Sequence, residues 1–341
     1  MIDSKISRRA LVAGMAALPL LPGVARAAGA GIGKITRFDP ALDALVDVNA
    51  PIEVLATGYK WSEGPVWVKD GGYLLFSDVP SNVIWKWKAG KGAVKFMEPS
   101  GLAGPIPAGV REAGANGLAI DARGQLIMAD SGSRCVASVD LKTRKKTVLA
   151  DKYDGKRFSS CNDVAIHGNG TIYFTDPPYG FSEGDSSPLK EIPFNGVYRR
   201  TALGEVHLVE NALTRPNGVA LSPDQQTLYV AISDPARPQV LAYPLDIEGG
   251  ASDQPRLLCD FSAEVAQKLP GLPDGLKVAK DGTIFASGPG GVYVLSAEGK
   301  KLGLIATGKA TANCAFGEDG KTLFLTSSDM IAKVRIKTAG W

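Results

Sequence analysis

The strongest constraint in this sequence is a unit that recurs six times. Each copy has a polar residue, an apolar strand, a turn, and a second apolar strand. The copies begin at Glu63, Asn116, Asn162, Asn217, Asp274 and Asn313, with spacings of 53, 46, 55, 57 and 39 residues. A repeat of about 50 residues that contains four short strands is typical of a β-propeller blade. The sequence therefore predicts an all-β fold, a six-bladed β-propeller.

The two ends of the chain predict how the ring closes. After Asn313 only three strands remain, whereas residues 52–56 form an apolar strand upstream of the first blade. We expect this N-terminal strand to complete the last blade, because that closure leaves no long sheet edge. The 40 glycines and 22 prolines agree with many tight turns. A single propeller domain over residues 51–341 then follows an N-terminal extension over residues 28–50.

The first 27 residues have the pattern of an export signal. Three basic side chains in residues 1–9 precede an apolar stretch over residues 11–24, and residues 25–27 form a small-x-small cleavage site. Residues 7–11, Ser-Arg-Arg-Ala-Leu, resemble the twin-arginine signal of bacteria. A membrane anchor is less favoured, because two prolines interrupt a stretch shorter than the roughly 20 residues that span a bilayer. We expect a periplasmic protein whose mature form is not attached to a membrane.

Charge, histidine and cysteine usage exclude several function classes. The 38 basic and 35 acidic residues give a net charge of +3 without a long basic run, which argues against a nucleic-acid binder. His167 and His207 are isolated, and there is no CxxC pair and no G-x-S-x-G motif. A zinc enzyme and a Ser-His-Asp hydrolase are therefore not favoured. We expect buried thiols at four cysteines, whose pairing the sequence leaves open: Cys135, Cys161, Cys259 and Cys314.

The residues that open the six repeats predict a metal site. In a blade the first strand lines the central channel, so these residues should form a ring at one channel mouth. All six are Glu, Asp or Asn. Asn-Gly and Asp-Gly are ordinary turn dipeptides, but turn chemistry gives no reason for an oxygen-bearing side chain in every blade. Such a cage suits a hard cation, calcium first, with magnesium, manganese or zinc as alternatives.

Three long segments are expected on the same face as this ring. They cover residues 98–115, 176–195 and 259–273, whereas the opposite face has mostly short turns. Long loops gathered on one face of a rigid scaffold are where binding sites are usually built.

Five short motifs extend this interpretation. They are WSEGPVW at 61–67, ND at 162–163, FTDPPYG at 174–180, RPNG at 215–218 and LPDG at 272–275. Together they resemble the gluconolactonase/SMP-30 family, over about residues 37–336. These are calcium-dependent six-bladed propellers that include lactone hydrolases and, more remotely, diisopropyl-fluorophosphatase-type phosphotriesterases.

The resemblance implies roles for individual residues. Glu63, Asn217 and Asp274 match the metal ligands, and Asn162 matches a further ligand or a contact to metal-bound water and substrate. Asn116 and Asn162 are expected to contact the substrate. Asp274 resembles the proposed general base, with Glu63 as the alternative base. Some animal members carry a substrate-recognising arginine two residues before Asn162, where this chain has Ser160.

The expected activity is calcium-dependent hydrolysis of a small lactone. In this reading the metal polarises the lactone carbonyl, and Asp274 takes a proton from the attacking water. Two alternatives stay open: a phosphotriesterase that uses the same site, and a calcium-binding propeller without catalysis. The expected partner is a small-molecule lactone, and we expect a monomer or a weak oligomer.

Overall fold

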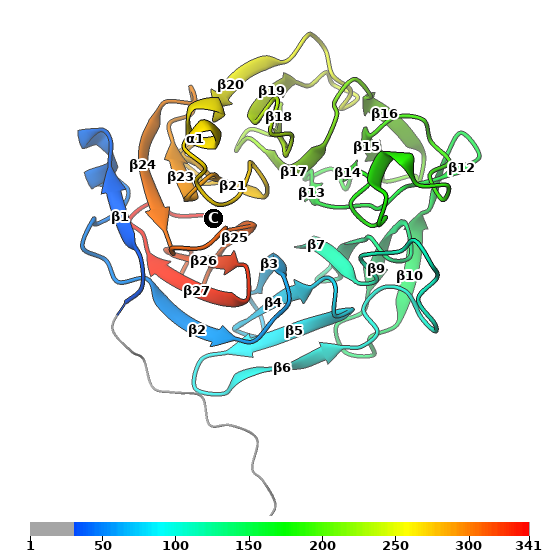
Figure 1. Ribbon diagram of the computed structural model, residues 1–341, viewed down its shortest axis with the longest axis horizontal. Coiled ribbons are helices and arrows are strands. Elements are labelled where there is room, and N and C mark those ends of the chain that lie inside the picture. The colour runs from blue at the N-terminus through cyan, green and yellow to red at the C-terminus, as the bar shows by residue number, and fades with distance from the viewer. Residues whose placement is uncertain (1–30, 341) are drawn as a thin grey trace, which may run out of the picture.

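Six antiparallel sheets stand around a central channel in the computed structural model, which describes residues 31–340 (Figure 1). Four of these sheets follow chain order from the channel to the rim, and the other two add an N-terminal strand at the rim. The innermost strands of the six sheets contact one another around the channel. This is the arrangement of propeller blades. The predicted six-bladed β-propeller is therefore confirmed. The predicted signal peptide, residues 1–27, lies outside the described residues.

Blades 1 to 4 are each built from one continuous stretch of chain. Blade 1 consists of β3 (Ser62–Val68), β4 (Tyr73–Asp78), β5 (Val83–Lys88) and β6 (Gly92–Met97). Blade 2 consists of β7 (Ala115–Ile120), β8 (Leu126–Asp130), β9 (Cys135–Val139) and β10 (Lys146–Ala150). Blade 3 consists of β13 (Val164–Ile166), β14 (Ile172–Asp176), β15 (Gly196–Arg200) and β16 (Val206–Glu210). Blade 4 consists of β17 (Pro216–Leu221), β18 (Thr227–Ile232), β19 (Gln239–Pro244) and β20 (Arg256–Asp260).

Short elements occupy three of the connections. They are the hairpin of β11 (Lys152–Tyr153) and β12 (Lys156–Arg157), the 3-10 helix η2 (Gly184–Ser186) and the helix α1 (Ser262–Ala266).

Blades 5 and 6 each include a strand from the N-terminal segment. Blade 5 has β21 (Leu276–Val278), β22 (Ile284–Gly288), β23 (Gly291–Leu295) and β24 (Lys301–Ala306), and blade 6 has β25 (Asn313–Gly317), β26 (Thr322–Ser327) and β27 (Met330–Arg335). β2 (Glu53–Thr57) pairs with β27 and completes blade 6, as predicted. β1 (Lys34–Arg37) pairs with β24 as a fifth strand of blade 5, which the sequence did not predict.

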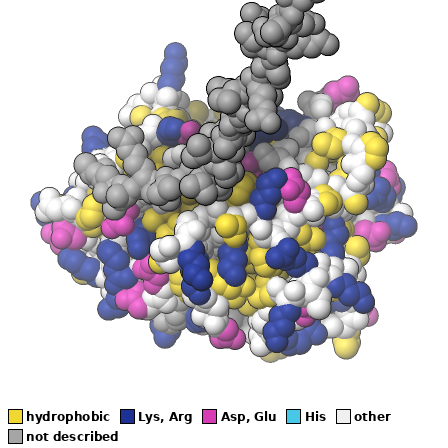
Figure 2. Space-filling view, turned by 90° about the horizontal axis from the view of Figure 1, so that it is seen from below, with side chains coloured by type: hydrophobic (Ala, Val, Ile, Leu, Met, Phe, Trp, Pro, Cys, Tyr) yellow, Lys and Arg dark blue, Asp and Glu magenta, His cyan; other side chains and the backbone are white. Residues whose placement is uncertain are grey.

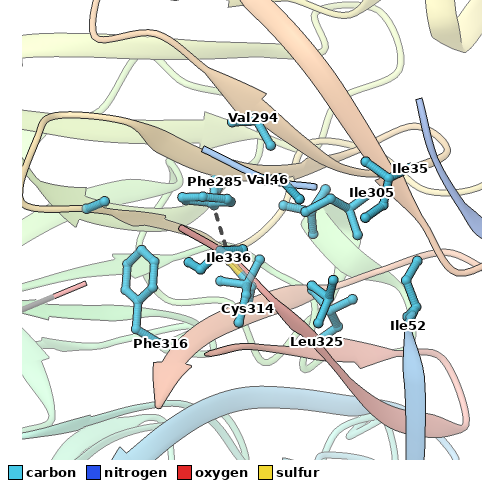
Figure 3. Close-up of a cluster of buried hydrophobic side chains, with 14 of the residues drawn as sticks. Ile35, Val46, Ile52, Phe285, Val294, Ile305, Cys314, Phe316, Leu325 and Ile336 are labelled. Atoms are coloured by element: carbon cyan, nitrogen blue, oxygen red, sulfur yellow. Dashed lines mark hydrogen bonds between the residues drawn. The ribbon is translucent and has the colours of Figure 1, made fainter. Parts of the chain in front are cut away.

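An apolar core shared by blades 5 and 6 holds the N-terminal segment in place (Figure 3). Ile35, Val46 and Ile52 pack into one buried cluster with strand side chains that include Ile305 and Leu325. Burial of each such side chain stabilises the fold by roughly 1.5–3 kcal/mol. The segment before residue 51 is therefore part of the propeller wherever it is described.

Leu42 tests how much this packing contributes. It lies on the 3-10 helix η1 (Pro40–Ala44), whose N-cap is Asp39, and its side chain is fully buried. Leu42→Ala is expected to lower the free energy of unfolding by about 2–5 kcal/mol, because it leaves a cavity in the core. The matched control is Leu203→Ala, at an exposed leucine, which should change it by less than about 0.5 kcal/mol. Urea denaturation measures both changes, and equal losses would contradict the proposed anchoring.

The side of the molecule seen in Figure 2 carries charged side chains of both signs. On the side that carries β2 and β6, Lys and Arg side chains are interspersed with apolar and acidic ones. Lys95 on β6 forms an ion pair with Glu98 at 2.7 Å. Charged side chains on an outer strand disfavour edge-to-edge pairing with another chain. Among the described residues there is no helix with the length and hydropathy needed to cross a bilayer.

All four cysteines are buried, and none of them forms a disulfide in the described part of the chain. Burial raises the pKa of Cys135 and of Cys314 to about 12. A thiol with such a pKa is almost entirely protonated near neutral pH and is a poor nucleophile. The prediction of buried thiols is confirmed.

Candidate metal centre

One end of the central channel opens into a cavity of about 560 Å³. Five of the six residues that open the repeats line it: Glu63, Asn116, Asn162, Asn217 and Asp274. They come from five different blades, which the ring brings together over more than 200 residues of sequence. The structure thus places the predicted metal ligands and both predicted substrate contacts in one cavity, while their roles stay predictions.

The close approach of the inner strands depends on the glycines that follow the ring residues. A Cβ atom on Gly218 would lie 2.1 Å from the carbonyl oxygen of Asp274, and one on Gly275 would lie 1.9 Å from Cγ of Asn313. Gly64 and Gly117 are packed in the same way against the next inner strand. The Asn-Gly and Asp-Gly pairs therefore lie at inner strands, where glycine is needed for close packing between blades.

Gly218→Ala is expected to disturb the site itself. The added methyl group overlaps the backbone of Asp274, so this carboxylate must shift, and overpacking of this kind typically costs about 1–3 kcal/mol. A displacement near 1 Å in a reacting group can cost about 100-fold in rate. Gly168→Ala is the control, because its nearest neighbour is the flexible side chain of Gln225. Thermal unfolding and lactone turnover measure both variants, and a fully active Gly218→Ala protein would contradict this packing.

Hydrogen bonds set the orientation of the asparagine side chains. Nδ2 of Asn217 donates to Oγ of Ser233 at 2.8 Å, and this hydroxyl donates to the carbonyl oxygen of Pro273. The amide oxygen of Asn217 is thereby left for the cavity. Asn116 and Asn162 are 5% and 6% exposed. Their side-chain amides make no hydrogen bond to another described residue. Both amides line the cavity and are not sealed off from it, so their polar atoms are available to whatever the cavity binds.

The carboxyl groups of Glu63 and Asp274 lie within hydrogen-bonding reach of each other. Burial raises the pKa of Glu63 to about 7, and the charge of Asp163 adds to this effect. Burial also raises the pKa of Asp274 well above its usual range, with the charge of Glu63 as the next cause. Two ionised carboxylates in this position repel each other, and a cation between them would relieve that repulsion.

The buried charges along the channel do not balance among themselves. Asp163 is 3% exposed, and its neighbour Lys277 donates through Nζ to Oδ1 of Asn313 at 3.4 Å. Glu63, Asp163 and Asp274 carry three negative charges when ionised, against one positive charge on Lys277. This excess of acidic groups beside Lys277 favours a bound cation, because buried charges require compensation.

The donor set fits calcium better than a transition metal. Across residues 31–340, no three His, Cys, Asp or Glu side chains converge on one metal-sized position. A cation in this cavity would therefore need amide oxygens beside the two carboxylates, and oxygen ligands of this kind suit hard cations such as calcium. Glu63, Asn162, Asn217 and Asp274 would hold it.

Asn313, the sixth ring residue, does not line the cavity. Its Oδ1 accepts the backbone N–H of Cys314 at 2.9 Å, and its Nδ2 donates to Oε2 of Glu63 at 3.1 Å. It therefore positions Glu63 instead of lining the cavity. The period of the repeat predicts where a residue lies on the ring, but not which way its side chain turns.

The charged cavity residues Arg111, Glu112 and Arg215 were not predicted from the sequence as members of the site. Arg111 and Glu112 lie in the loop before blade 2, and Arg215 precedes Asn217. The sequence signals for them were the long loop over residues 98–115 and the RPNG motif, within which Arg215 stands. Tyr179, in the FTDPPYG motif, also lines the cavity, and its motif suggests an aromatic side chain that shapes the pocket. Arg111 and Glu112 belong to no repeat and no motif.

The other end of the channel holds a larger cavity of about 760 Å³. Its lining is largely apolar and comes mainly from the inner strands, with Trp67 and Phe316 among them, and from Gly340. Lys277, Asp70 and Asp121 are polar members, but they are not arranged as a set of facing carboxylates and amides. The carboxyl and amide groups of the candidate site therefore lie at the mouth that carries the long loops.

Comparison with known proteins identifies the family of this chain. A family model described as the SMP-30/Gluconolactonase/LRE-like region matches residues 61–329. The chain belongs to this family. The resemblance seen in the five motifs is thus confirmed, and the matched region runs from the motif that holds Glu63 to the last blade.

Two gluconolactonases are similar to this member of the SMP-30/gluconolactonase/LRE-like family. The gluconolactonase of Zymomonas mobilis subsp. mobilis is 48% identical over 338 residues, which cover 96% of this chain and 95% of that protein. A solved gluconolactonase structure from Xanthomonas campestris has a TM-score of 0.77 at 28% identity and covers 91% of this chain and 99% of that one. A diisopropyl-fluorophosphatase of Loligo vulgaris is 25% identical over 287 residues, covering 79% of this chain and 86% of that protein.

Proposed function

We propose that this chain hydrolyses a small lactone of the gluconolactone type with calcium held by Glu63, Asn162, Asn217 and Asp274. The observation that carries the proposal is the pair of facing, buried carboxyls beside amide groups that lack a partner. The 48% identical gluconolactonase, which matches along nearly its whole length, supports the lactonase activity.

Bound calcium would supply positive charge where the carbonyl oxygen of the lactone becomes negative as water attacks. The carboxylate of Asp274 accepts a proton from that water while the water oxygen bonds to the carbonyl carbon. The ring C–O bond then breaks, and Asp274 returns the proton to the departing oxygen, so that the product is a hydroxy acid. Asn313 keeps Glu63 in place through Oε2, and Ser233 keeps the amide of Asn217 turned the right way.

The test is turnover of glucono-δ-lactone and simpler γ- and δ-lactones by the purified protein, followed with a pH indicator. Hydrolysis clearly above the spontaneous rate is expected, with sensitivity to chelation. No turnover of any lactone by a protein that binds calcium tightly would reject the lactonase proposal and leave a calcium-binding propeller without catalysis.

A second candidate is phosphotriester hydrolysis at the same site. The similarity to a diisopropyl-fluorophosphatase favours it, because that relative spans 79% of this chain. A polarised phosphoryl oxygen needs the same cation as a carbonyl oxygen, so loop residues decide between the two substrates. A higher kcat/KM for diisopropyl fluorophosphate than for every lactone tested would favour this candidate.

We also propose that the protein acts in the periplasm as a monomer or a weak oligomer. The basic residues, apolar stretch and Ala-Arg-Ala site in residues 1–27 support export. N-terminal sequencing of protein from a periplasmic fraction should find a start near Ala28. An intact N-terminus on cytoplasmic protein would reject export, and sedimentation tests the oligomeric state.

A further inference from the structure

Two long loops are paired with each other at the cavity rim. The backbone N–H groups of Arg111 and Glu112 donate to the carbonyl oxygen of Gly180, at 2.8 and 3.3 Å. Ser182 donates in the same way to Gly109 at 2.8 Å, and Val110 forms an isolated β-bridge with Phe181. We call this pairing of residues 109–112 with residues 180–182 the interloop bridge.

Ser160 fixes one side of the interloop bridge. Its Oγ donates to the carbonyl oxygen of Pro177 and accepts the N–H of Gly180 at 2.9 Å. Asp176 accepts the N–H groups of Ser159 and Ser160, each at 2.8 Å. Ser160 stands at the position where some animal family members carry a substrate-recognising arginine. In this chain it holds the loop backbone, so substrate recognition has to come from other side chains. A rim held in this way is preorganised for a ligand.

The interloop bridge places one further carboxylate in the cavity. The side chain of Glu112 is only 17% exposed, and its Oε1 accepts Nη2 of Arg111 at 3.1 Å. Its Oε2 accepts the hydroxyl of Ser131 at 3.2 Å. A carboxylate has about four acceptor positions, so Glu112 keeps acceptor capacity after these two bonds. Arg111 likewise has donors left, because one Nη2 contact uses one of five N–H groups.

The proposed hydrolysis gives Glu112 no task. Asp274 already accepts the proton from water, and a third carboxylate in the cavity only adds negative charge to the pair formed by Glu63 and Asp274. Burying a carboxylate costs free energy. Its presence in the cavity is therefore explained if it binds a ligand there. Several hydroxyl groups can be bound at once by a site that has both acceptors, here on Glu112, and donors, here on Arg111. Tyr179 adds a hydroxyl, which donates to the backbone carbonyl oxygen of Arg215 over a long distance of 3.5 Å.

We propose that Glu112 and Arg111 bind the ring hydroxyl groups of the substrate and so select polyhydroxylated lactones over unsubstituted ones. This inference rests on the proposed lactonase activity for its kinetic readout. It assigns substrate selection to the loop before blade 2, apart from the residues that would hold the metal. Hydroxyl groups bonded to a buried charged side chain give strong discrimination, because a substrate without them leaves that charge unpaired.

The experiment compares two six-membered lactones, glucono-δ-lactone, which carries ring hydroxyls, and δ-valerolactone, which carries none. Glu112→Gln is expected to lower kcat/KM for glucono-δ-lactone about 10- to 100-fold, mainly through KM, and to change that for δ-valerolactone less than about threefold. The matched control is Glu98→Gln, which removes an exposed carboxylate at the start of the same loop and should leave both values unchanged. Equal losses on both lactones, or no loss on either, would overturn the inference.

A binding measurement keeps the inference testable if the protein hydrolyses neither lactone. Methyl glucoside is a neutral polyhydroxylated ring that cannot react as a lactone, and Trp61 in the cavity provides a fluorescence signal. Binding to the wild-type protein is expected, and Glu112→Gln should weaken it at least tenfold without changing the thermal unfolding midpoint by more than a few degrees. An affinity unchanged by Glu112→Gln, or no binding to the wild-type protein, would overturn the assignment independently of catalysis.

Discussion

Asp274→Asn should reduce lactone hydrolysis by about 100- to 10,000-fold while the propeller stays folded. The amide keeps the size of the side chain and one oxygen, but it cannot accept a proton from water. Loss of a positioned general base typically costs this much in rate. Removal of a charge from two facing carboxyls also relieves repulsion, so the variant without metal should unfold at a temperature no lower than the wild-type protein without metal.

Two measurements separate the base from the ligand role of Asp274. Bound calcium is determined alongside turnover, because a variant that retains calcium and loses activity has lost the base itself. Asp70→Asn is the control, since Asp70 lies at the opposite channel mouth and should not affect turnover. An Asp274→Asn protein that keeps more than about a tenth of the activity would show that another group takes the proton, and Glu63→Gln would then be measured as the variant of the alternative base.

Removal of the metal should abolish activity and lower the unfolding temperature, and addition of calcium should restore both. Without a cation, Glu63 and Asp274 cannot both be ionised without strong mutual repulsion, and burial raises the pKa of each of them. A ligand that binds only the folded state at about 100 times its Kd stabilises it by about 2.7 kcal/mol. Activity that is unchanged after dialysis against a chelator, with calcium shown to be absent, would exclude a catalytic metal.

Glu63→Gln tests whether Glu63 is one of the calcium ligands. This variant should bind calcium more weakly, because it loses one of two charged ligands. Its metal-free form should be more stable than the metal-free wild-type protein, because one repelling charge is gone. Thermal unfolding of both proteins with and without calcium gives the four values. A Glu63→Gln protein stabilised by calcium as strongly as the wild-type protein would place the ion elsewhere.

The repeat period carries most of what the sequence could predict. Because a closed ring brings the blade starts together, an oxygen-bearing side chain at one position of each blade was enough to place Glu63, Asn162, Asn217 and Asp274 around one channel. Family membership and the gluconolactonase-like relatives agree with the motifs around those residues. The same period could not show that Asn313 stays out of the cavity lining, because its side chain is held by the N–H of Cys314 and by Glu63.

Features outside the repeat had no comparable signal. β1 is four residues long, Lys-Ile-Thr-Arg, and its apolar content is a single isoleucine. Its place is decided by β24 and by the core around Ile35. Arg111 and Glu112 reach the cavity through the interloop bridge, which is formed by irregular backbone without a pattern of alternating side chains. An Asn-Gly pair read alone is equally consistent with a turn and with the tight packing seen at Gly218.

The origin of β1 and β2 affects how the protein can be made. Lys34 pairs with Ala306, and Glu53 pairs with Lys333, so these early segments leave the ribosome long before their partners are synthesised. Contacts between such distant parts of a chain form slowly, and until they form, two outer strand edges stay open to other chains. Ring completion therefore has to follow translation. The twin-arginine route carries proteins across the membrane already folded. If this signal operates, the precursor cannot be exported until β1 and β2 have paired with blades 5 and 6.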